Sequence, residues 1–541
     1  MFRYEITALA EFRQRFFLPS FKFLELSIFP KLSCGALNVD KPQDSLPVNS
    51  SQSLSTNAGL VPTLGLFSTV MMVVGSVIGS GIFKKSGIMA AQVGSPELLL
   101  IVWVLAGVIT LFGALTNAEV AGIVPETGGQ YAYFDRMFGP FFAYLYGWAV
   151  FAVIQTGSIA AVAYIFAEYA TKFVPLPELP SSLASLSFHV PFVADITPFA
   201  DIGTKGLAAL LVVGLTAVNY LGVRFGGVVQ NIFTIAKVAA MALLMLAAFL
   251  LPTGGSVTNL TTSSGIIHPA GLALFAAMMA AMQGAFWAYD GWNTISYIGG
   301  EVKQPRRNIP LGLAIGMGVV IVIYLLVNLA YAYVLPVDVM AHSKLVAADV
   351  AEKCFSGGGR WIAAAVMVST FGTANGMILA SARVYFSMSR RNVFPRFLGR
   401  THPRFHTPAA SLIVQGLWST LLLLSGTFDT LTDMLIFVSW IFYVAGAYGV
   451  FVLRRKMPDT PRPYKVPGYP FVPWIFITFA AIYLAFTVYN DITGYRAAIA
   501  AGTPARMDSV FGVVLVLAGA PIYWFYRSKP KTSSAQHETS S

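Results

Sequence analysis

Apolar spans of roughly 20 residues or more, the length that crosses a bilayer, follow one another along most of the chain. Short polar loops separate them, and charged residues inside them are rare. Twelve such spans lie near residues 64–93, 97–123, 138–171, 205–222, 226–251, 269–299, 310–335, 360–389, 408–426, 430–453, 470–490 and 508–527. This pattern predicts an all-α integral membrane protein with twelve transmembrane helices.

Two of these spans contain residues that interrupt a helix. Residues 75–81 (GSVIGSG) hold three glycines, each of which costs about 1 kcal/mol relative to alanine in a helix. The sixth span carries Asp290, Gly291 and Asn293 near its middle. Helix packing through the Gly75–Gly79 pair would explain the first span alone. Interrupted helices five spans apart, and so running in opposite directions, are instead typical of inverted-repeat transporters.

A break at mid-membrane releases backbone groups that hydrocarbon leaves without partners. The N-terminus of a half-helix favours an anion, and we expect the released donors around Ser80, Gly81 and Ile82 to bind one. The released carbonyls around Trp287 and Ala288 suit a cation. An α-amino acid zwitterion carries both charges.

The overall charge indicates membrane topology. The 541 residues are 56% hydrophobic and 11% charged, where soluble domains have about 25% charged residues. Lysine and arginine gather in the termini and in the loops that an even number of spans places on one side. The positive-inside rule makes that side cytoplasmic, so the net charge of +11 does not indicate nucleic-acid binding. We expect a plasma membrane protein, in bacteria an inner-membrane protein.

Other sequence features narrow the function. No Gly-Lys-Ser/Thr phosphate loop is present, which argues against an ATP-driven pump. Cys34 and Cys354 are far apart and form no metal-binding pattern, so neither a metal nor a cofactor is expected. We expect residues 1–60 to be a partly disordered cytoplasmic extension, 61–530 a twelve-helix transporter domain, and 531–541 a disordered cytoplasmic tail.

Charged residues within the apolar spans are candidates for a functional role. Lys237 lies near mid-membrane, where a lysine costs about 3 kcal/mol on insertion scales. It is too deep to reach the interface, so we expect a buried partner. Asp290 has three open roles: contact with a substrate amine, proton uptake, or a hydrogen bond to the broken backbone.

Other polar and charged residues of the spans, near their ends or at mid-membrane, have a structural explanation as well as a functional one. For Glu119, helix capping or helix–helix bonding is favoured over coupling. Asn375 and Ser381 either face a site or bond between helices. Arg383 is placed to pair with an acid at the cytoplasmic side.

Several motifs resemble those of the amino acid–polyamine–organocation (APC) superfamily, and within it the L-type amino acid transporter family. They occur in the family's order from about residue 64 to 527. They are residues 79–83 (GSGIF), 125–133 (PETGGQYAY), 229–237 (VQNIFTIAK), 287–293 (WAYDGWN) and 301–310 (EVKQPRRNIP).

The resemblance implies a LeuT-like fold, with two inverted five-helix repeats, discontinuous helices 1 and 6, and two further helices. It also implies that backbone in both breaks holds the substrate carboxylate and amino group, with Trp287 shielding the substrate. The residues so implied are Val77, Gly79, Ser80, Gly81, Trp287 and Asp290.

Lys237 resembles a built-in cation at the sodium site of related symporters. The resemblance places it between helix 1 near Gly79 and helix 8 near Ser381, and implies sodium-independent transport. Asp290 stands where many animal members have glycine. The loop 172–204 lacks the cysteine that animal light chains use to link a glycoprotein partner. The chain thus resembles stand-alone bacterial members, and no disulfide-linked heavy chain is expected.

We therefore expect an alternating-access exchanger of neutral amino acids. The alternative is a proton-coupled symporter of an amino acid or amine, with Asp290 or Glu119 carrying the proton. A channel would need rings of carbonyls or charged groups around a pore. Two broken helices and a single buried lysine fit that arrangement poorly. A membrane enzyme would need a clustered nucleophile and base. A sensor that binds an amino acid without moving it stays open, as does the oligomeric state.

Overall fold

The computed structural model describes residues 62–527 except 127, 187, 191–193, 253–254, 266, 268, 426–427 and 502–506. The expected extension (1–60), which includes Cys34, and the expected tail (531–541) lie outside the described residues. The described part of the chain is almost entirely helical.

Helices occupy all twelve expected spans. Eleven of those in the described residues are long and apolar enough to cross a membrane, and the ninth, α17, is shorter, with its apolar part at Ala409–Leu424. The helices of the spans are α2 (Leu66–Val77), α3 (Gly81–Val93), α4 (Pro96–Ile123), α6 (Pro140–Ala149), α7 (Gln155–Ala170), α9 (Ile202–Tyr220), α10 (Val223–Leu250), α11 (Gly271–Tyr289), α13 (Pro305–Val334), α16 (Gly358–Arg390), α17 (Ala409–Ser425), α18 (Phe428–Lys456), α19 (Phe471–Ala500), α20 (Asp508–Leu517) and α21 (Gly519–Arg527).

Shorter elements connect these helices. An antiparallel hairpin in which Phe188 pairs with Ile196 adds two strands to the expected all-α architecture. The π-helix η1 continues α6 into α7 within one span. The short elements are α5 (Gln130–Phe138), η1 (Val150–Ile154), α8 (Ser181–Ala184), β1 (Phe188–Val190), β2 (Ala194–Ile196), η2 (Val257–Leu260), α12 (Thr294–Tyr297), η3 (Gly299–Glu301), α14 (Val337–His342), α15 (Val346–Cys354) and η4 (Arg396–Gly399).

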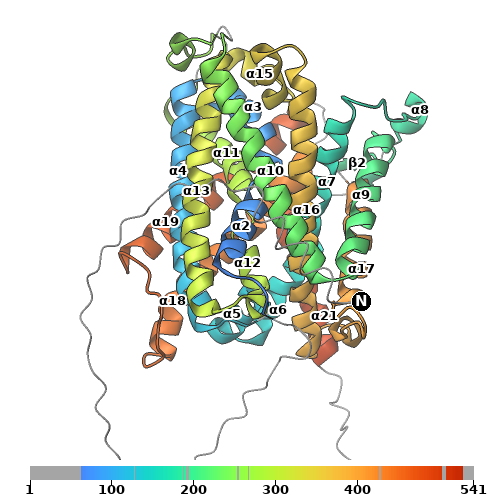
Figure 1. The fold of residues 1–541 in the computed structure, drawn as a ribbon, viewed down its shortest axis with the longest axis vertical. Helices are drawn as coiled ribbons and strands as arrows, with labels where there is room; N and C mark the ends of the chain where they lie inside the picture. Colours follow the sequence, from blue (N-terminus) through green and yellow to red (C-terminus); the bar gives the residue numbers. More distant parts are fainter. Residues whose placement is uncertain are drawn as a thin grey trace, which may run out of the picture. The chain divides into compact units, whose positions relative to one another are not determined.

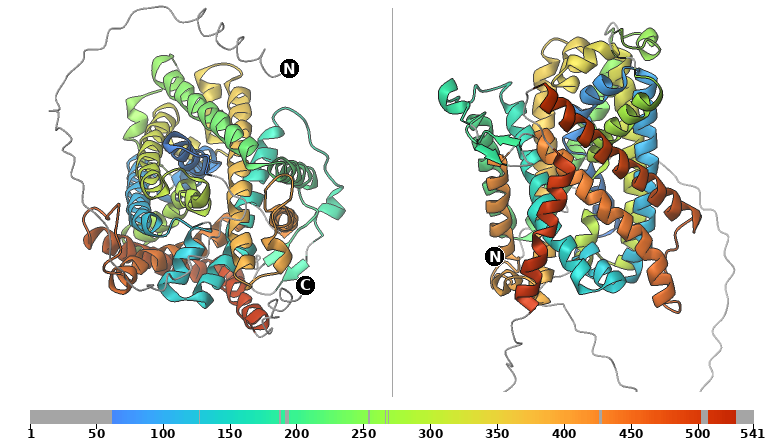
Figure 2. Two further views of the ribbon diagram at one scale, coloured as in Figure 1. Left: turned by 60° about the horizontal axis from the view of Figure 1, so that its bottom comes forward. Right: turned by 180° about the vertical axis from the view of Figure 1, so that it is seen from behind.

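The interrupted first span lies among the other helices (Figure 1). Helix α3 packs on α11, whereas α2 packs on α13 and α10. Helices α7 and α10 both pack on α16, and α9 packs on α17 and α7. The right-hand view of Figure 2, taken from behind, shows α18 to α21, orange to red, in front of the other helices. The polar backbone of the breaks is thereby surrounded by protein.

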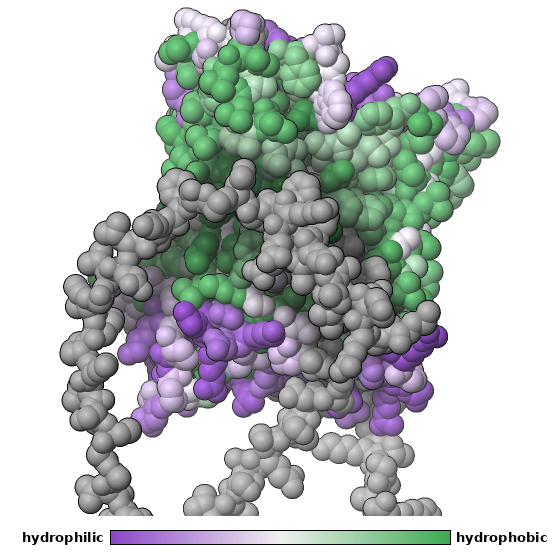
Figure 3. Space-filling model, viewed as in Figure 1, coloured by the Kyte–Doolittle hydropathy of each residue, from purple (hydrophilic) through white to green (hydrophobic). Residues whose placement is uncertain are grey.

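Basic side chains gather at one end of the described region, which we call the basic end. It contains α5 and the last turns of α16 and α18: Arg391 pairs with Asp135, and Lys456 Nζ donates to Met137 O at 2.9 Å. Hydrophilic surface is concentrated there, whereas apolar surface covers much of the remaining height (Figure 3). Helix α15 lies at the opposite end (Figure 1).

Both breaks occur where the sequence predicts them. Helix α2 ends at Val77 and α3 begins at Gly81, while α11 ends at Tyr289 and α12 begins at Thr294. Gly284 lies inside α11, before the second break. A Cβ there would be 3.2 Å from Met89 Cγ, so this glycine permits close helix packing.

Two glycines on α13 allow α2 to approach it closely. A Cβ on Gly312 would lie 2.5 Å from Thr69 Cγ2, and one on Gly316 would lie 2.7 Å from Val73 Cγ1. Small residues four positions apart let helix backbones come together where hydrophobicity cannot drive association.

We predict that Gly316→Leu destabilises the protein by about 1–3 kcal/mol or more, because the added side chain overpacks the α2–α13 contact. The measurement is thermal unfolding in detergent. Gly318→Leu is the matched control, since a Cβ on Gly318 meets nothing within 4 Å. Equal melting temperatures for the two variants would contradict this packing role.

Candidate functional site

A small cavity lies between the two breaks and the helices α7 and α16. About 10 Å³ of it is open to the centre of a water-sized sphere, close to the minimum that one water needs. Six of the eight residues expected to bind substrate line it; Ile82 and Ala288 do not. The lining residues are Ser76, Val77, Gly79, Ser80, Gly81, Val162, Trp287, Asp290, Thr373 and Met377.

The N-terminus of α3 presents hydrogen-bond donors at this cavity. Its N-cap, Ser80, makes no side-chain capping bond, so the first turn keeps backbone N–H groups without a helical partner. The Ser80 hydroxyl is buried and has no partner among the described residues. Together with the partial positive charge of the helix terminus, these groups form a site suited to a carboxylate.

Gly81 lines the cavity and also takes part in helix packing. A Cβ at this position would lie 2.5 Å from Ala288 Cα, so the missing side chain allows α3 to contact α11. Enlarging it would separate two helices, so such a variant cannot probe the carboxylate site alone.

The carbonyls released at the breaks are already engaged. Tyr324 of α13 places its hydroxyl 3.0 Å from Val77 O and 2.9 Å from Ala288 O. Trp287 O accepts from the Asp290 amide at 3.2 Å. The expectation of free carbonyls at Trp287 and Ala288 is therefore wrong in this conformation. Buried carbonyls need partners, and the sequence did not identify Tyr324 as one.

Lys237 is fully engaged at the first break. Its side chain is buried, and Nζ donates to Gly75 O at 2.9 Å, Ile78 O at 2.6 Å and Thr373 Oγ1 at 2.8 Å. These three acceptors match the three protons of an ammonium. The C-terminal end of α2 also carries partial negative charge, which favours a cation there.

The expected partners of Lys237 are partly wrong. On α16 the contact is Thr373, and on the first span the contacts flank Gly79 without including it. Ser381 lies about two turns further along α16, where its hydroxyl hydrogen-bonds with Met377 O at 2.6 Å and Gln415 Oε1 at 2.7 Å. Helices α10 and α16 also meet where Phe233 stacks on Phe371.

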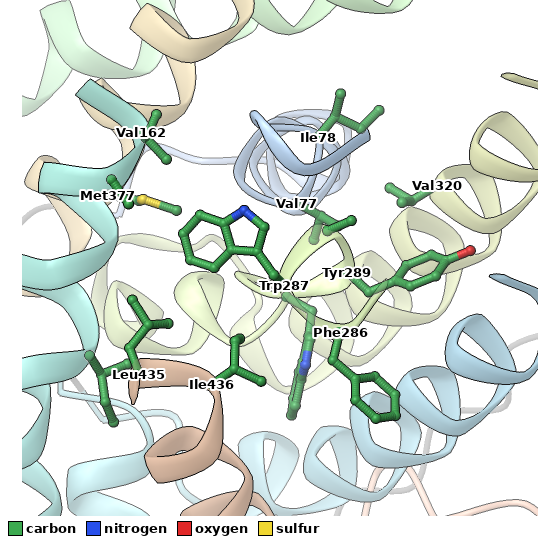
Figure 4. Close-up of a cluster of buried hydrophobic side chains, with 14 of the residues drawn as sticks. Val77, Ile78, Val162, Phe286, Trp287, Tyr289, Val320, Met377, Leu435 and Ile436 are labelled. Atoms are coloured by element: carbon green, nitrogen blue, oxygen red, sulfur yellow. The ribbon is translucent and has the colours of Figure 1, made fainter. Parts of the chain in front are cut away.

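Asp290 borders the cavity, and its carboxylate is hydrogen-bonded by neutral groups. Its Oδ1 accepts from the Tyr443 hydroxyl at 2.6 Å, and the Gly291 amide also bonds its carboxylate. Figure 4 shows the neighbouring Trp287 indole amid Val77, Val162 and Met377. The indole N–H has no partner among the described residues, and its ring meets Phe428 edge-on at 5.8 Å.

A buried polar cluster closes the cavity toward the basic end. Asn293 Nδ2 donates to Gln130 Oε1 at 2.9 Å and to the Tyr297 hydroxyl at 3.0 Å. Tyr146 lies 2.7 Å from the Tyr297 hydroxyl. Beyond it, Arg383 pairs with Glu301 at 3.1 Å, and both side chains are at most 2% exposed. The expected pairing of Arg383 with an acid is confirmed.

Two adjacent lysines of α3 tie that helix to its neighbours toward the opposite end. Lys84 Nζ lies 2.7 Å from Glu168 Oε2 of α7. Lys85 Nζ donates to Thr432 Oγ1 of α18 at 3.1 Å. Both ammonium groups also lie over the Phe428 ring, 5.1 and 4.9 Å from its centroid. With the polar cluster at the basic end, these contacts leave the cavity closed on both sides.

Glu119 and Asn375 make contacts between helices. Glu119 accepts from Arg454 Nε at 2.9 Å, Arg454 Nη2 at 2.7 Å and the Val466 amide at 2.8 Å. Asn375 Oδ1 accepts from Asn219 Nδ2 at 2.9 Å. Both lie away from the cavity lining. Within the described residues, no group of three His, Cys, Asp or Glu side chains is arranged to hold a metal ion.

These features define a multi-span membrane protein whose interrupted helices enclose a small polar site closed at both ends. The family model described as amino acid permease matches residues 64–518. The chain belongs to this family of the APC superfamily and is an amino acid transporter, not an enzyme.

Curated relatives match over most of their own length. The chain is 29% identical to the serine/threonine exchanger SteT of Bacillus subtilis, over 86% of this chain and 97% of that protein. It is 31% identical to the human b(0,+)-type amino acid transporter 1, over 79% and 82%. It is 30% identical to the rat large neutral amino acids transporter small subunit 2, over 91% and 86%.

We predict that Lys237→Met lowers the transport rate at least about tenfold, equivalent to about 1.4 kcal/mol. The variant removes three hydrogen bonds from a buried ammonium, and one hydrogen bond to a charged group is worth about 1.5–3 kcal/mol. Transport is measured in proteoliposomes that contain equal amounts of correctly inserted protein. The exposed Lys344→Met serves as the control. A rate within about twofold of the parent protein would contradict the role of Lys237.

Proposed function

We propose that the protein is a sodium-independent exchanger of neutral amino acids that works by alternating access. In this proposal it has a twelve-helix LeuT-like fold, its basic end faces the cytoplasm, and it acts in the plasma membrane without a disulfide-linked heavy chain. The family membership and the relatives whose names describe an exchanger and neutral amino acid transport support this function.

The contacts of Lys237 carry the sodium-independent part of the proposal. Two backbone carbonyls and one hydroxyl surround its ammonium at hydrogen-bonding distance. Oxygen atoms of these kinds also suit a hard metal cation. A lysine that supplies the positive charge leaves no need for a sodium ion at this position.

The substrate orientation follows from the polarity of the two breaks. The α-carboxylate faces the uncapped N-terminus of α3 at Ser80 and Gly81, with the Ile82 amide in the same first turn. The α-amino group faces the Val77 carbonyl and the Asp290 carboxylate. Trp287 covers the side chain. The closed cavity must widen for a substrate to enter, so binding is linked to a conformational change.

A proton-coupled symporter is the second candidate, and one observation favours it. The Asp290 carboxylate is 6% exposed, and its Tyr443 and Gly291 contacts are neutral. A buried carboxylate in such surroundings can bind and release a proton during transport. Glu119 is the weaker candidate for this role because two arginines surround it.

Uptake into sodium-free proteoliposomes tests the proposal. We expect labelled serine, threonine or leucine to enter vesicles loaded with unlabelled amino acid at least about ten times faster than empty vesicles, as obligate exchange requires. Equal uptake into loaded and empty vesicles would overturn exchange. A requirement for sodium would overturn the role assigned to Lys237.

The same vesicles separate the two candidates when a pH gradient is added. Exchange predicts that empty vesicles stay inactive with an acidic exterior, whereas proton coupling predicts uptake that Asp290→Asn abolishes. Glu119→Gln is the comparison variant. Uptake driven by the gradient in the parent protein and lost only in Asp290→Asn would establish the second candidate.

A further inference from the structure

An apolar groove lies between α9 and α17, two helices that pack together at the edge of the described region (Figure 1). Its volume is about 430 Å³, within the range of about 300–1,000 Å³ found for small-molecule sites. Val213 and Leu221 form one wall and Ile413 and Leu417 the other, and each is between 46% and 61% exposed. In a bilayer this groove opens toward the lipid.

Small residues create the groove. A Cβ on Gly416 would lie 2.7 Å from Thr216 Oγ1, so this glycine allows α17 to approach α9 at the groove's floor. Ala217, on the exposed side of α9, covers little of the space above that floor. The recess therefore has a fixed place along the two helices.

A polar group without a partner lies in this apolar lining. Thr216 is only 9% exposed, and its hydroxyl has no hydrogen-bond partner among the described residues. A hydroxyl left unpaired in hydrocarbon is costly, so a ligand acceptor at this point would be stabilised. Thr216 lies one turn before Tyr220, the last residue of α9. This is the depth at which a lipid carries its ester carbonyls, just below the headgroup.

The loop before α17 is held against this end of the groove. The Tyr220 ring lines the groove and meets His402 at 5.2 Å and Phe405 at 5.8 Å. His402 Nδ1 accepts from the amides of Arg404 and Phe405, both at 3.2 Å. Thr407 Oγ1 donates to Tyr220 O at 2.9 Å. These contacts place Arg404 next to the rim of the groove.

The charge at this rim is positive. The Arg404 side chain is exposed, and its guanidinium carbon lies 5.5 Å from the centroid of the Phe405 ring. Residues 392–425 contain Arg396, Arg400 and Arg404 but no aspartate or glutamate. Arginine binds phosphate oxygens in a geometry that suits its planar group, and basic residues beside an apolar pocket are typical of anionic lipid sites.

We propose that the groove between α9 and α17 binds an acyl chain of an anionic phospholipid, with Thr216 donating to an ester carbonyl and Arg404 binding the phosphate. A partner helix fits less well, because a spanning helix is about 30 Å long, whereas residues 213–220 cover only about 10 Å of α9. The groove and the cavity between the breaks have no lining residue in common. The inference is therefore independent of the proposed exchange.

Native mass spectrometry of the purified full chain in detergent tests the lipid site. The probes are phosphatidylglycerol and phosphatidylethanolamine with the same acyl chains. We expect one molecule of phosphatidylglycerol to bind at least about ten times more tightly than phosphatidylethanolamine. Ala217→Trp, which fills the groove from an exposed position, should weaken binding of both lipids at least about tenfold.

Leu210→Trp is the matched control for the groove. Leu210 is 70% exposed on the same helix and lies outside the groove lining, so its replacement should change neither affinity by more than about twofold. Equal lipid binding by Ala217→Trp and Leu210→Trp would overturn the inference. So would a second protein chain that occupies the groove, seen as a dimer that Ala217→Trp alone dissociates.

Two further variants test the assigned contacts separately. Arg404→Gln should lower the affinity for phosphatidylglycerol to that for phosphatidylethanolamine, whereas Arg360→Gln, an exposed arginine in the first turn of α16 at the opposite end, should not. Thr216→Val should weaken both lipids alike, because both carry the ester. Equal affinity of the parent protein for the two lipids, or a headgroup preference that survives Arg404→Gln, would contradict the proposed site.

Discussion

Backbone groups within a bilayer need partners, and this constraint governs the centre of the molecule. Interrupting two helices exposes carbonyls at the ends of α2 and α11 and amides at the start of α3. Lys237, Thr373 and Tyr324 supply partners for the carbonyls. The amides at the start of α3 face the cavity instead. At the first break, the carbonyls on the α2 side therefore have hydrogen-bond partners, whereas the amides on the α3 side are available to a ligand.

The contacts around the cavity differ in character at its two ends. Toward the basic end, closure depends on buried side chains, including the Arg383–Glu301 pair. Separating a buried charge pair is costly because each charge loses its compensation. Toward the opposite end, the Lys84–Glu168 pair is partly exposed, with side chains 13% and 27% accessible. Exposed pairs are worth less and are screened by salt. The two closures therefore respond differently to ionic strength.

The sequence predicted the features that depend on local composition. Glycine and polar residues within apolar spans located both breaks, and the depth of Lys237 indicated a buried partner. These inferences follow from the free-energy cost of placing a polar group in hydrocarbon. That cost depends on the residue type and its depth in the span, and both can be read from the sequence. The position of Arg383 within its span likewise predicted a pairing that the structure contains.

Features that depend on helix rotation and crossing could not be predicted in the same way. Thr373 and Ser381 are both small hydroxyl residues on α16, and only the packing against α10 decides which one meets Lys237. Tyr324 and Tyr443 lie in apolar spans, where a tyrosine is indistinguishable from a packing residue until its hydroxyl has a partner. The packing of Gly81 against Ala288 could not be predicted either, because the two residues are distant in the sequence.

The Lys237 ammonium is covalently attached to the chain, and this affects the energy source that transport can use. An ion that dissociates can leave on the far side of the membrane and transfer the energy of its gradient to a solute. A charge carried by the chain returns with every cycle, so it transfers none. A carrier with this fixed charge and no other coupling ion cannot use an ion gradient to accumulate amino acids.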